Sequence, residues 1–333
     1  MRARLLRSRR VVIAATMAAA VVSVLAAQQA PPAQPNFDAV TVRSFKVQDH
    51  VFMLAGAGGN ITAQIGNDGV LVVDTQFAQM ADKLLAEIAR LSGNKPIRYV
   101  IDTHVHPDHV GGNERFRRAG RAIIAGNVAG DVGGNEGATV IAHENVAARM
   151  SKQDGTTPPA PGGAMPTDTF FGESDEVFFN GEAVQLIHQP AAHTDGDVMV
   201  FFRKSDVIAT GDVYVNTSYP VIDTARGGTI NGIIAGLNRI IEITVPRDKQ
   251  EGGTMVIPGH GRIADEADVV EYRDMVTIIR DRVQEMAKRG MTVQQIKAAR
   301  PSLEYDGLYG ATTGNWTTDM FLETVYREIS VRK

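Results

Sequence analysis

The sequence predicts an α+β fold in which two β-sheets form a sandwich covered by helices, an αββα arrangement with a further helical layer at the C-terminus. Three observations predict it. Short strand-like runs fill two stretches of the chain, at about 50–142 and 177–257. Each of these β-rich halves also contains a helical pattern, and helical patterns alone fill the segment 265–333.

In the first half, period-two alternation and turn signals mark the strands, and apolar residues at helical spacing mark a helix that ends before Gly93 and Pro96. The turn signal Asn67-Asp68-Gly69 leads into a buried apolar run. The expected elements are, in order, strands 50–56, 61–65 and 70–73, a helix 77–91, a strand 99–101, a helix through 111–118, and strands 121–125 and 139–142.

A Pro/Gly-rich segment at 151–169 separates the halves and is expected to be a loop that flanks a site. Thr292 and Gln295 form a capping-box pattern, and Pro301 ends the helix that follows. The later elements are expected as strands 177–179, 183–188, 198–202, 207–210 and 254–257, and as helices 231–242, 265–288, 292–299 and 317–329.

The N-terminus has the pattern of an export signal. Residues 1–10 contain five Arg and no acid, and the apolar run 11–25 follows. A signal peptide is therefore expected over 1–26, a flexible leader over 27–40 and one folded domain over 41–333. Ser8-Arg9-Arg10 resembles the twin-arginine type of signal, and an ordinary basic region is the alternative.

The predicted location is the periplasm or the cell exterior, with no stable membrane span after cleavage. The apolar run is shorter than the roughly twenty residues that a membrane span requires, and an uncleaved anchor is the alternative.

Charge excludes one class of partner. Removing the five N-terminal Arg changes the formal net charge from −4 to −9, and no basic patch remains that could neutralise a phosphate backbone. Nucleic acid is therefore not expected as a partner, and the expected partner is a small-molecule substrate. The sequence does not indicate an oligomeric state. The chain has no Cys, so neither a disulfide nor a thiolate metal ligand can contribute.

The hexapeptide His104-Val-His106-Pro-Asp108-His109 follows a strand-like apolar run and contains three of the eight His in the chain. Imidazole nitrogens and carboxylate oxygens are the ligands of open, catalytic zinc sites. Three further turns each place His or Asp beside Gly after a predicted strand, at His193, Asp212 and His260. A neighbouring Gly lets the backbone turn sharply, so ligands from several strand ends can converge on one point.

In this order, the motifs resemble those of the metallo-β-lactamase superfamily over about residues 45–262: His-x-His-x-Asp-His, a later His, an Asp in a Gly-Asp turn and a final Gly-His. The resemblance implies the metallo-β-lactamase fold and two Zn²⁺ per chain. It implies that one zinc is bound by His104, His106 and His193, that the other is bound by Asp108, His109 and His260, and that Asp212 bridges both.

Two metals with open positions can share a hydroxide that attacks a carbonyl carbon. Asp108 is expected to hold the proton of the nucleophile as a catalytic residue, with a role as a ligand alone as the alternative. Asp74 and Asp197 are candidates to orient ligating imidazoles, with turn or capping roles as the alternative.

Several polar residues near the predicted site have weaker patterns. Tyr214 and Asn216 follow the bridging Asp and could donate to an oxyanion, although ordinary structural roles are favoured. Core packing is also favoured over a pocket role for Tyr309 and Trp316. Structural or surface positions are expected for the three His outside the motifs, which are His50, His143 and His188.

Asp212 stands where two lactamase subclasses have Cys, and Asp there is typical of glyoxalase II-like thioesterases and lactonases. The expected function is a dinuclear zinc hydrolase of a cyclic amide, an ester or a thioester, with β-lactam hydrolysis as a main or side activity. The alternatives are a mononuclear iron sulfur dioxygenase-like enzyme and a non-catalytic periplasmic module that binds metal or docks a partner.

Overall fold

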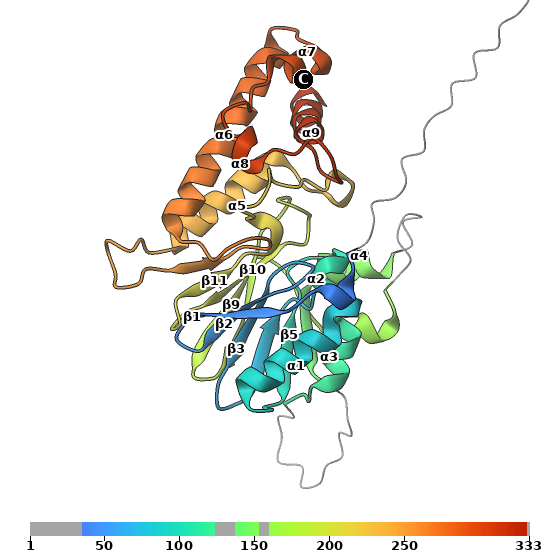
Figure 1. The fold of residues 1–333 in the computed structure, drawn as a ribbon, viewed down its shortest axis with the longest axis vertical. Coiled ribbons are helices and arrows are strands. Elements are labelled where there is room, and N and C mark those ends of the chain that lie inside the picture. The colour runs from blue at the N-terminus through green and yellow to red at the C-terminus, as the bar shows by residue number, and fades with distance from the viewer. Residues whose placement is uncertain (1–34, 124–136, 153–159, 332–333) are drawn as a thin grey trace, which may run out of the picture. The chain divides into compact units, whose positions relative to one another are not determined.

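The computed structural model describes residues 35–123, 137–152 and 160–331 (Figure 1). The signal peptide predicted over 1–26 and most of the leader predicted over 27–40 lie outside the described residues. Residues Phe37–Ala39 form a 3-10 helix, and the Lys83 ammonium donates to the carbonyls of Phe37, Asp38 and Val40. The end of the leader therefore contacts the folded domain.

The first sheet has seven strands that follow one another in sequence order. The first four pair antiparallel through short hairpin connections, and the rest pair parallel because helices cross between them. The strands are β1 (Arg43–Gln48), β2 (Val51–Ala55), β3 (Ile61–Ile65), β4 (Val70–Val73), β5 (Ile97–Ile101), β6 (Thr139–His143) and β7 (Asp168–Phe170).

The second sheet has five strands in the order β12-β11-β10-β9-β8. Antiparallel hairpins join the first four in the chain, and the last pairs parallel with β11 after a helical crossover. The strands are β8 (Ser174–Phe179), β9 (Glu182–His188), β10 (Val198–Phe202), β11 (Val207–Ala209) and β12 (Met255–Ile257), and the crossover helix is α5 (Ile230–Ile243).

Alternation along the strands of the first sheet separates two apolar cores, one on each face. Met53 and Leu71 face the second sheet, where they meet Val200, whereas Leu54 and Val72 face helices on the outer side of the first sheet. Side chains point alternately to the two faces of a strand, so one sheet can be covered on both sides. The covering helices of the first sheet are α1 (Ala81–Ser92) and α3 (Asn113–Ala119). The expected αββα sandwich is confirmed.

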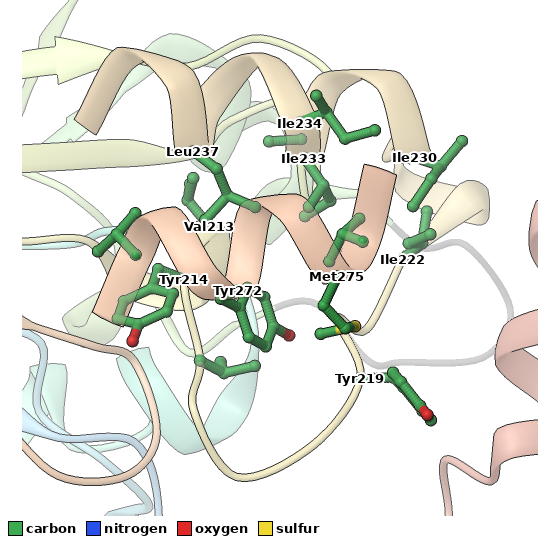
Figure 2. Close-up of a cluster of buried hydrophobic side chains, with 14 of the residues drawn as sticks. Val213, Tyr214, Tyr219, Ile222, Ile230, Ile233, Ile234, Leu237, Tyr272 and Met275 are labelled. Carbon is green, nitrogen blue, oxygen red and sulfur yellow. The ribbon is translucent and has the colours of Figure 1, made fainter. Parts of the chain in front are cut away.

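The C-terminal helical layer is also confirmed. It consists of α6 (Glu266–Lys288), α7 (Val293–Ala299), α8 (Asp306–Tyr309) and α9 (Thr318–Val331). Figure 2 shows how Tyr272 and Met275 of α6 lie in one cluster with Leu237 of α5 and with Tyr219. The predicted capping box of Thr292 and Gln295 is present. These helices pack on the outer face of the second sheet through a shared core.

The structure differs from the predicted elements at several places. Helix α4 (Glu144–Ser151), which follows β6, was not predicted. No strand forms over Arg121–Ile123, and the rest of the strand predicted at 121–125 lies outside the described residues. β1 was not predicted, because both of its faces carry exposed residues and apolar alternation is weak. β7 overlaps the end of the predicted loop 151–169 and has only three residues. Among the described residues, no helix is both long and apolar enough to cross a membrane.

Candidate metal centre

The predicted ligands lie together at one edge of the sandwich, because each follows the end of a strand. His104 and His106 come after β5, and His193 lies between β9 and β10. Asp212 lies in the 3-10 turn Gly211–Val213 after β11, and His260 follows β12. Asp108 and His109 lie on α2 (Pro107–Val110), which begins with a Pro at its first position, where Pro is well tolerated.

The first group of potential ligands comprises His104, His106, His193 and Asp212. Each residue offers one ligand atom, and these atoms all lie within 4.8 Å of one another. Nδ1 of His106 lies 2.9 Å from Nε2 of His193. Oδ2 of Asp212 lies 4.0 Å from Nε2 of His104 and 3.7 Å from Nε2 of His193. This group can hold one metal ion.

The second group comprises Asp108, His109 and His260, whose ligand atoms also lie within 4.8 Å of one another. Oδ2 of Asp108 lies 3.2 Å from Nε2 of His260. Oδ1 of Asp212 lies 3.3 Å from Nε2 of His109 and 3.5 Å from Nε2 of His260. The carboxylate of Asp212 therefore presents one oxygen to each group.

The hydrogen bonds of the imidazoles fit metal binding. His104 donates from Nδ1 to Thr103 Oγ1, His193 from Nδ1 to the carbonyl of Val221, and His109 from Nδ1 to Asp74. The remaining ring nitrogen of each is then an acceptor that faces the group. Nε2 of His104 is fully buried and has no hydrogen-bond partner among the described residues. A buried nitrogen without a partner is costly, and a metal ion would compensate that cost.

Asp74 supports both groups of ligands, as the sequence predicted. Its Oδ2 accepts from Nδ1 of His109 at 2.7 Å and from the hydroxyl of Thr103 at 2.8 Å, and its Oδ1 accepts from the Thr103 amide. Thr103 in turn accepts from His104 at 3.0 Å. One buried carboxylate thus fixes the ring orientation of a ligand in each group.

Asp223 has a similar role for His106, and the sequence did not predict it. Its Oδ2 accepts from Nε2 of His106 at 2.8 Å and from Arg226 at 2.7 Å. Its backbone amide donates to the carbonyl of His193. Asp223 is a single acidic residue in a loop without a repeating pattern, so nothing in the sequence distinguished it.

Asp197 does not orient an imidazole, which corrects that prediction. Its carboxylate accepts from the amide and the hydroxyl of Thr194, at 2.8 and 2.6 Å. It therefore holds the turn that carries His193, and burial raises its pKa to about 8.

The electrostatic environment differs between the two groups. Burial, followed by the neighbouring imidazoles, lowers the pKa of His104, and burial lowers the pKa of His193 to about 4. Burial would also lower the pKa of His109, but the carboxylates of Asp212 and Asp74 outweigh it and raise that pKa well above its usual value. His104 and His193 thus offer neutral nitrogens, whereas His109 holds a proton more tightly than usual.

Two glycines allow the backbone to approach the ligands closely. A Cβ on Gly59 would lie 2.3 Å from Cε1 of His109, and a Cβ on Gly259 would lie 2.1 Å from Oδ1 of Asp212. Both contacts are shorter than real Cβ atoms make, so no larger residue fits without displacing a ligand.

Tyr214 and Asn216 do not join either ligand group. Tyr214 is buried, with its ring 5.3 Å from that of Tyr272 (Figure 2). Asn216 donates to the carbonyl of Arg262 and accepts from the Arg262 amide. Both have the structural roles that the sequence favoured.

The three remaining His also lie outside the ligand groups, as predicted. His50 lies 3.0 Å from Asp49, and the rings of His143 and His188 stack with centroids 3.6 Å apart. Tyr309 and Trp316 pack against the core of the helical layer rather than against the ligands.

The chain resembles several enzymes in sequence. It is 24% identical over 262 residues to the linear primary-alkylsulfatase of Pseudomonas sp. (strain ATCC 19151), and the match covers 69% of this chain and 47% of the sulfatase. It is 21% identical over 211 residues to the type 2 metallo-beta-lactamase of Bacillus cereus, and this match covers 62% of this chain and 69% of that enzyme. The chain thus spans about half the length of the sulfatase.

Solved structures show the same fold. The DIM-1 metallo-beta-lactamase superposes with a TM-score of 0.51 at 16% identity, over 72% of this chain and 98% of that chain. The sec-alkylsulfatase Pisa1 from Pseudomonas sp. superposes with a TM-score of 0.58 at 16% identity, over 86% of this chain and 50% of that chain. The family model of the metallo-beta-lactamase superfamily matches residues 55–262, which include all the ligands described above, and the chain therefore belongs to this superfamily.

Proposed function

We propose that the protein is a dinuclear zinc hydrolase. The observation that carries the proposal is the position of Asp212, whose two oxygens face different groups of ligands. One zinc would be held by His104, His106 and His193, and the other by Asp108, His109 and His260. Nitrogen and oxygen ligands without thiolate are typical of catalytic zinc sites with an open position.

Zinc ions held in this way would supply water of lowered pKa at neutral pH and a positive charge that polarises the bond to be cleaved. The protein supplies the rigid frame for this chemistry. Asp74 and Asp223 fix the imidazole rings, and Gly59 and Gly259 let the backbone close tightly around them. Ligands held in this way keep their geometry during turnover.

Asp108 is the proposed catalytic residue. Its side chain is 26% exposed, whereas those of His104 and His109 are fully buried, so it can reach a bound substrate. Its Oδ2 lies 3.2 Å from Nε2 of His260, so the carboxylate stands beside the second ligand group. Asp108 would take up the proton of the attacking water and return it to the leaving group.

The proposed substrates are small molecules with a hydrolysable cyclic amide, ester or thioester bond, with β-lactam hydrolysis as a main or side activity. The similarity to a metallo-beta-lactamase, and 24% identity over 232 residues to the acyl-coenzyme A thioesterase MBLAC2 of Gallus gallus, support this range. That second match covers 65% of this chain and 76% of the thioesterase.

A sulfate ester is the second candidate substrate class. The match to a linear primary-alkylsulfatase covers 69% of this chain, the largest share among the curated relatives named above. Because the chain spans only 47% of that enzyme, sulfatase activity requires its own test.

We also propose that the protein acts in the periplasm or outside the cell. The five Arg at 1–10 and the apolar run that follows them support an export signal, which is of either the twin-arginine or the ordinary type. Amino-terminal sequencing of the exported protein would locate the cleavage site. A mature chain that still begins at Met1 would contradict cleavage.

The experiment that tests the activity combines metal analysis with a substrate panel. We expect about two zinc ions per chain and hydrolysis of at least one chromogenic lactam, lactone, thioester or alkyl sulfate. Asp108→Ala and His193→Ala should abolish this hydrolysis, and His50→Gln, outside both ligand groups, should retain it.

Other outcomes would favour the alternatives. One iron per chain together with oxygen consumption would favour a dioxygenase. Full zinc loading without turnover of any substrate would favour a non-catalytic metal-binding module.

A further inference from the structure

A cavity of about 590 Å³ adjoins the metal centre. His260 of the second ligand group lines it, as does Gly58, whose backbone approaches that of Asp108. The lining also includes two arginines and four apolar side chains, which are Arg43, Arg262, Phe45, Met53, Ala55 and Ile263. The cavity therefore offers space for a molecule that reaches the metal centre.

One face of the β1–β2 hairpin forms a wall of the cavity. Arg43 pairs with Ala55 and Phe45 pairs with Met53 in the strand register, so the four side chains share one face. Met53 is 3% exposed and belongs to the core between the sheets, whereas Phe45 is 39% exposed. The apolar surface of the core thus continues into the cavity, where an apolar ligand could cover Phe45.

The two arginines of the lining differ in their partners. Arg262 forms two hydrogen bonds to the carboxylate of Asp268, at 2.5 and 2.9 Å. Arg43 forms no ion pair with any described residue, and its guanidinium lies 5.8 Å from the ring centroid of Phe45. The charge of Arg43 is therefore available to an anion, next to the apolar wall.

We propose that this cavity binds an anionic small molecule that carries an apolar chain or ring. The apolar part lies on Phe45, Met53 and Ile263, and the carboxylate or sulfate group pairs with Arg43. We take this molecule to be the substrate, because His260 of the second ligand group lines the same cavity. That assignment rests on the proposed function. Binding itself requires only the cavity.

Isothermal titration calorimetry on the zinc-loaded protein tests the proposal with two probes of equal chain length, octane-1-sulfonate and neutral 1-octanol. Arg43→Gln should weaken sulfonate binding about tenfold, equivalent to about 1.4 kcal/mol, and leave octanol binding unchanged. Phe45→Ala should weaken binding of both probes. Lys46→Gln is the matched control, because Lys46 lies on the same strand but pairs with Phe52 on the opposite face.

The proposal is overturned if the wild-type protein does not bind the sulfonate. Equal affinity in Arg43→Gln and the wild type, or an equal loss in Lys46→Gln, would also overturn it. Hydrolysis of the substrate panel without the expected binding pattern would reject this cavity and keep the hydrolase. The expected binding pattern without any hydrolysis would keep the cavity and reject the proposed function.

Discussion

Nε2 of His106 donates a hydrogen bond to Oδ2 of Asp223 at 2.8 Å, although 117 residues separate them in the sequence. This bond leaves Nδ1 of His106 free to face Nε2 of His193 at 2.9 Å. Asp223 also binds Arg226 and, through its backbone, His193. One residue in a loop therefore fixes the ring of one ligand and the backbone of another.

Replacing Asp223 should weaken metal binding without unfolding the protein. In Asp223→Asn the ring of His106 loses its charged acceptor, so we expect the affinity for zinc to fall about 10- to 100-fold. Competition with a chromogenic chelator measures this affinity. Asp82→Asn is the matched control, because Asp82 also pairs with an arginine, Arg115, but is exposed on α1. Equal affinity in the two variants would contradict the role of Asp223.

The absence of a side chain at Gly59 should be essential for metal binding by the second ligand group. In Gly59→Ala the new methyl group would lie 2.3 Å from Cε1 of His109, so the ring or the loop must move. We expect the zinc content to fall from about two ions per chain toward one. Gly307→Ala is the control, because nothing lies within 4 Å of a Cβ at that position. Full zinc content in Gly59→Ala, measured by elemental analysis, would refute this expectation.

The candidate ligands that the structure brings together each have a local signal in the sequence. His104 to His109 form a dense motif after an apolar strand, and Asp212 and His260 each stand beside Gly after a strand. Each signal lies within a few residues of the ligand itself, so the strand order was not needed to find it.

The residues around the ligands depend on tertiary contacts and were harder to predict. Asp74 was predicted because it ends a strand, whereas Asp223 is a loop residue without such a position. The cavity wall was missed because β1 was not predicted, and the pairing of Phe45 with Met53 follows only from the strand register. Periodicity shows which faces are apolar, but not which faces meet.

Zinc binding should depend on pH through His109. The carboxylates of Asp212 and Asp74 outweigh burial and raise its pKa, so below that raised value zinc must displace a proton from the ring. The apparent affinity should therefore rise about tenfold per pH unit for one displaced proton, and should level off above the raised pKa. His193, with a pKa of about 4, is already neutral in this range.

Calorimetric titration with zinc in two buffers of different ionisation enthalpy measures the number of protons released. We expect about one proton from His109 at neutral pH. His260 should add to the release, because Asp212 and Asp108 outweigh burial and raise its pKa as well. His109→Asn, which lacks one titrating ring, should release fewer protons than the wild type. An affinity that is independent of pH between about 6.5 and 8 would exclude this coupling.

The helical layer should stabilise the loop that follows Asp212. The ring of Phe321 on α9 stacks on Tyr219 with centroids 4.8 Å apart, and the amide of Tyr219 donates to the carbonyl of Tyr309. Phe321 is fully buried, so Phe321→Ala should lower the free energy of unfolding by about 3–5 kcal/mol, because it leaves a cavity between α9 and this loop. Urea denaturation measures the change.

The neighbouring Met320 provides the control for this variant, because it is 42% exposed on the same helix and a truncation there removes little buried surface. We expect Met320→Ala to change stability by less than about 0.5 kcal/mol. If the helical layer unfolded independently of the sandwich, Phe321→Ala would separate the denaturation curve into two transitions. A single cooperative transition shifted to lower urea would instead show that α9 and the sandwich unfold together.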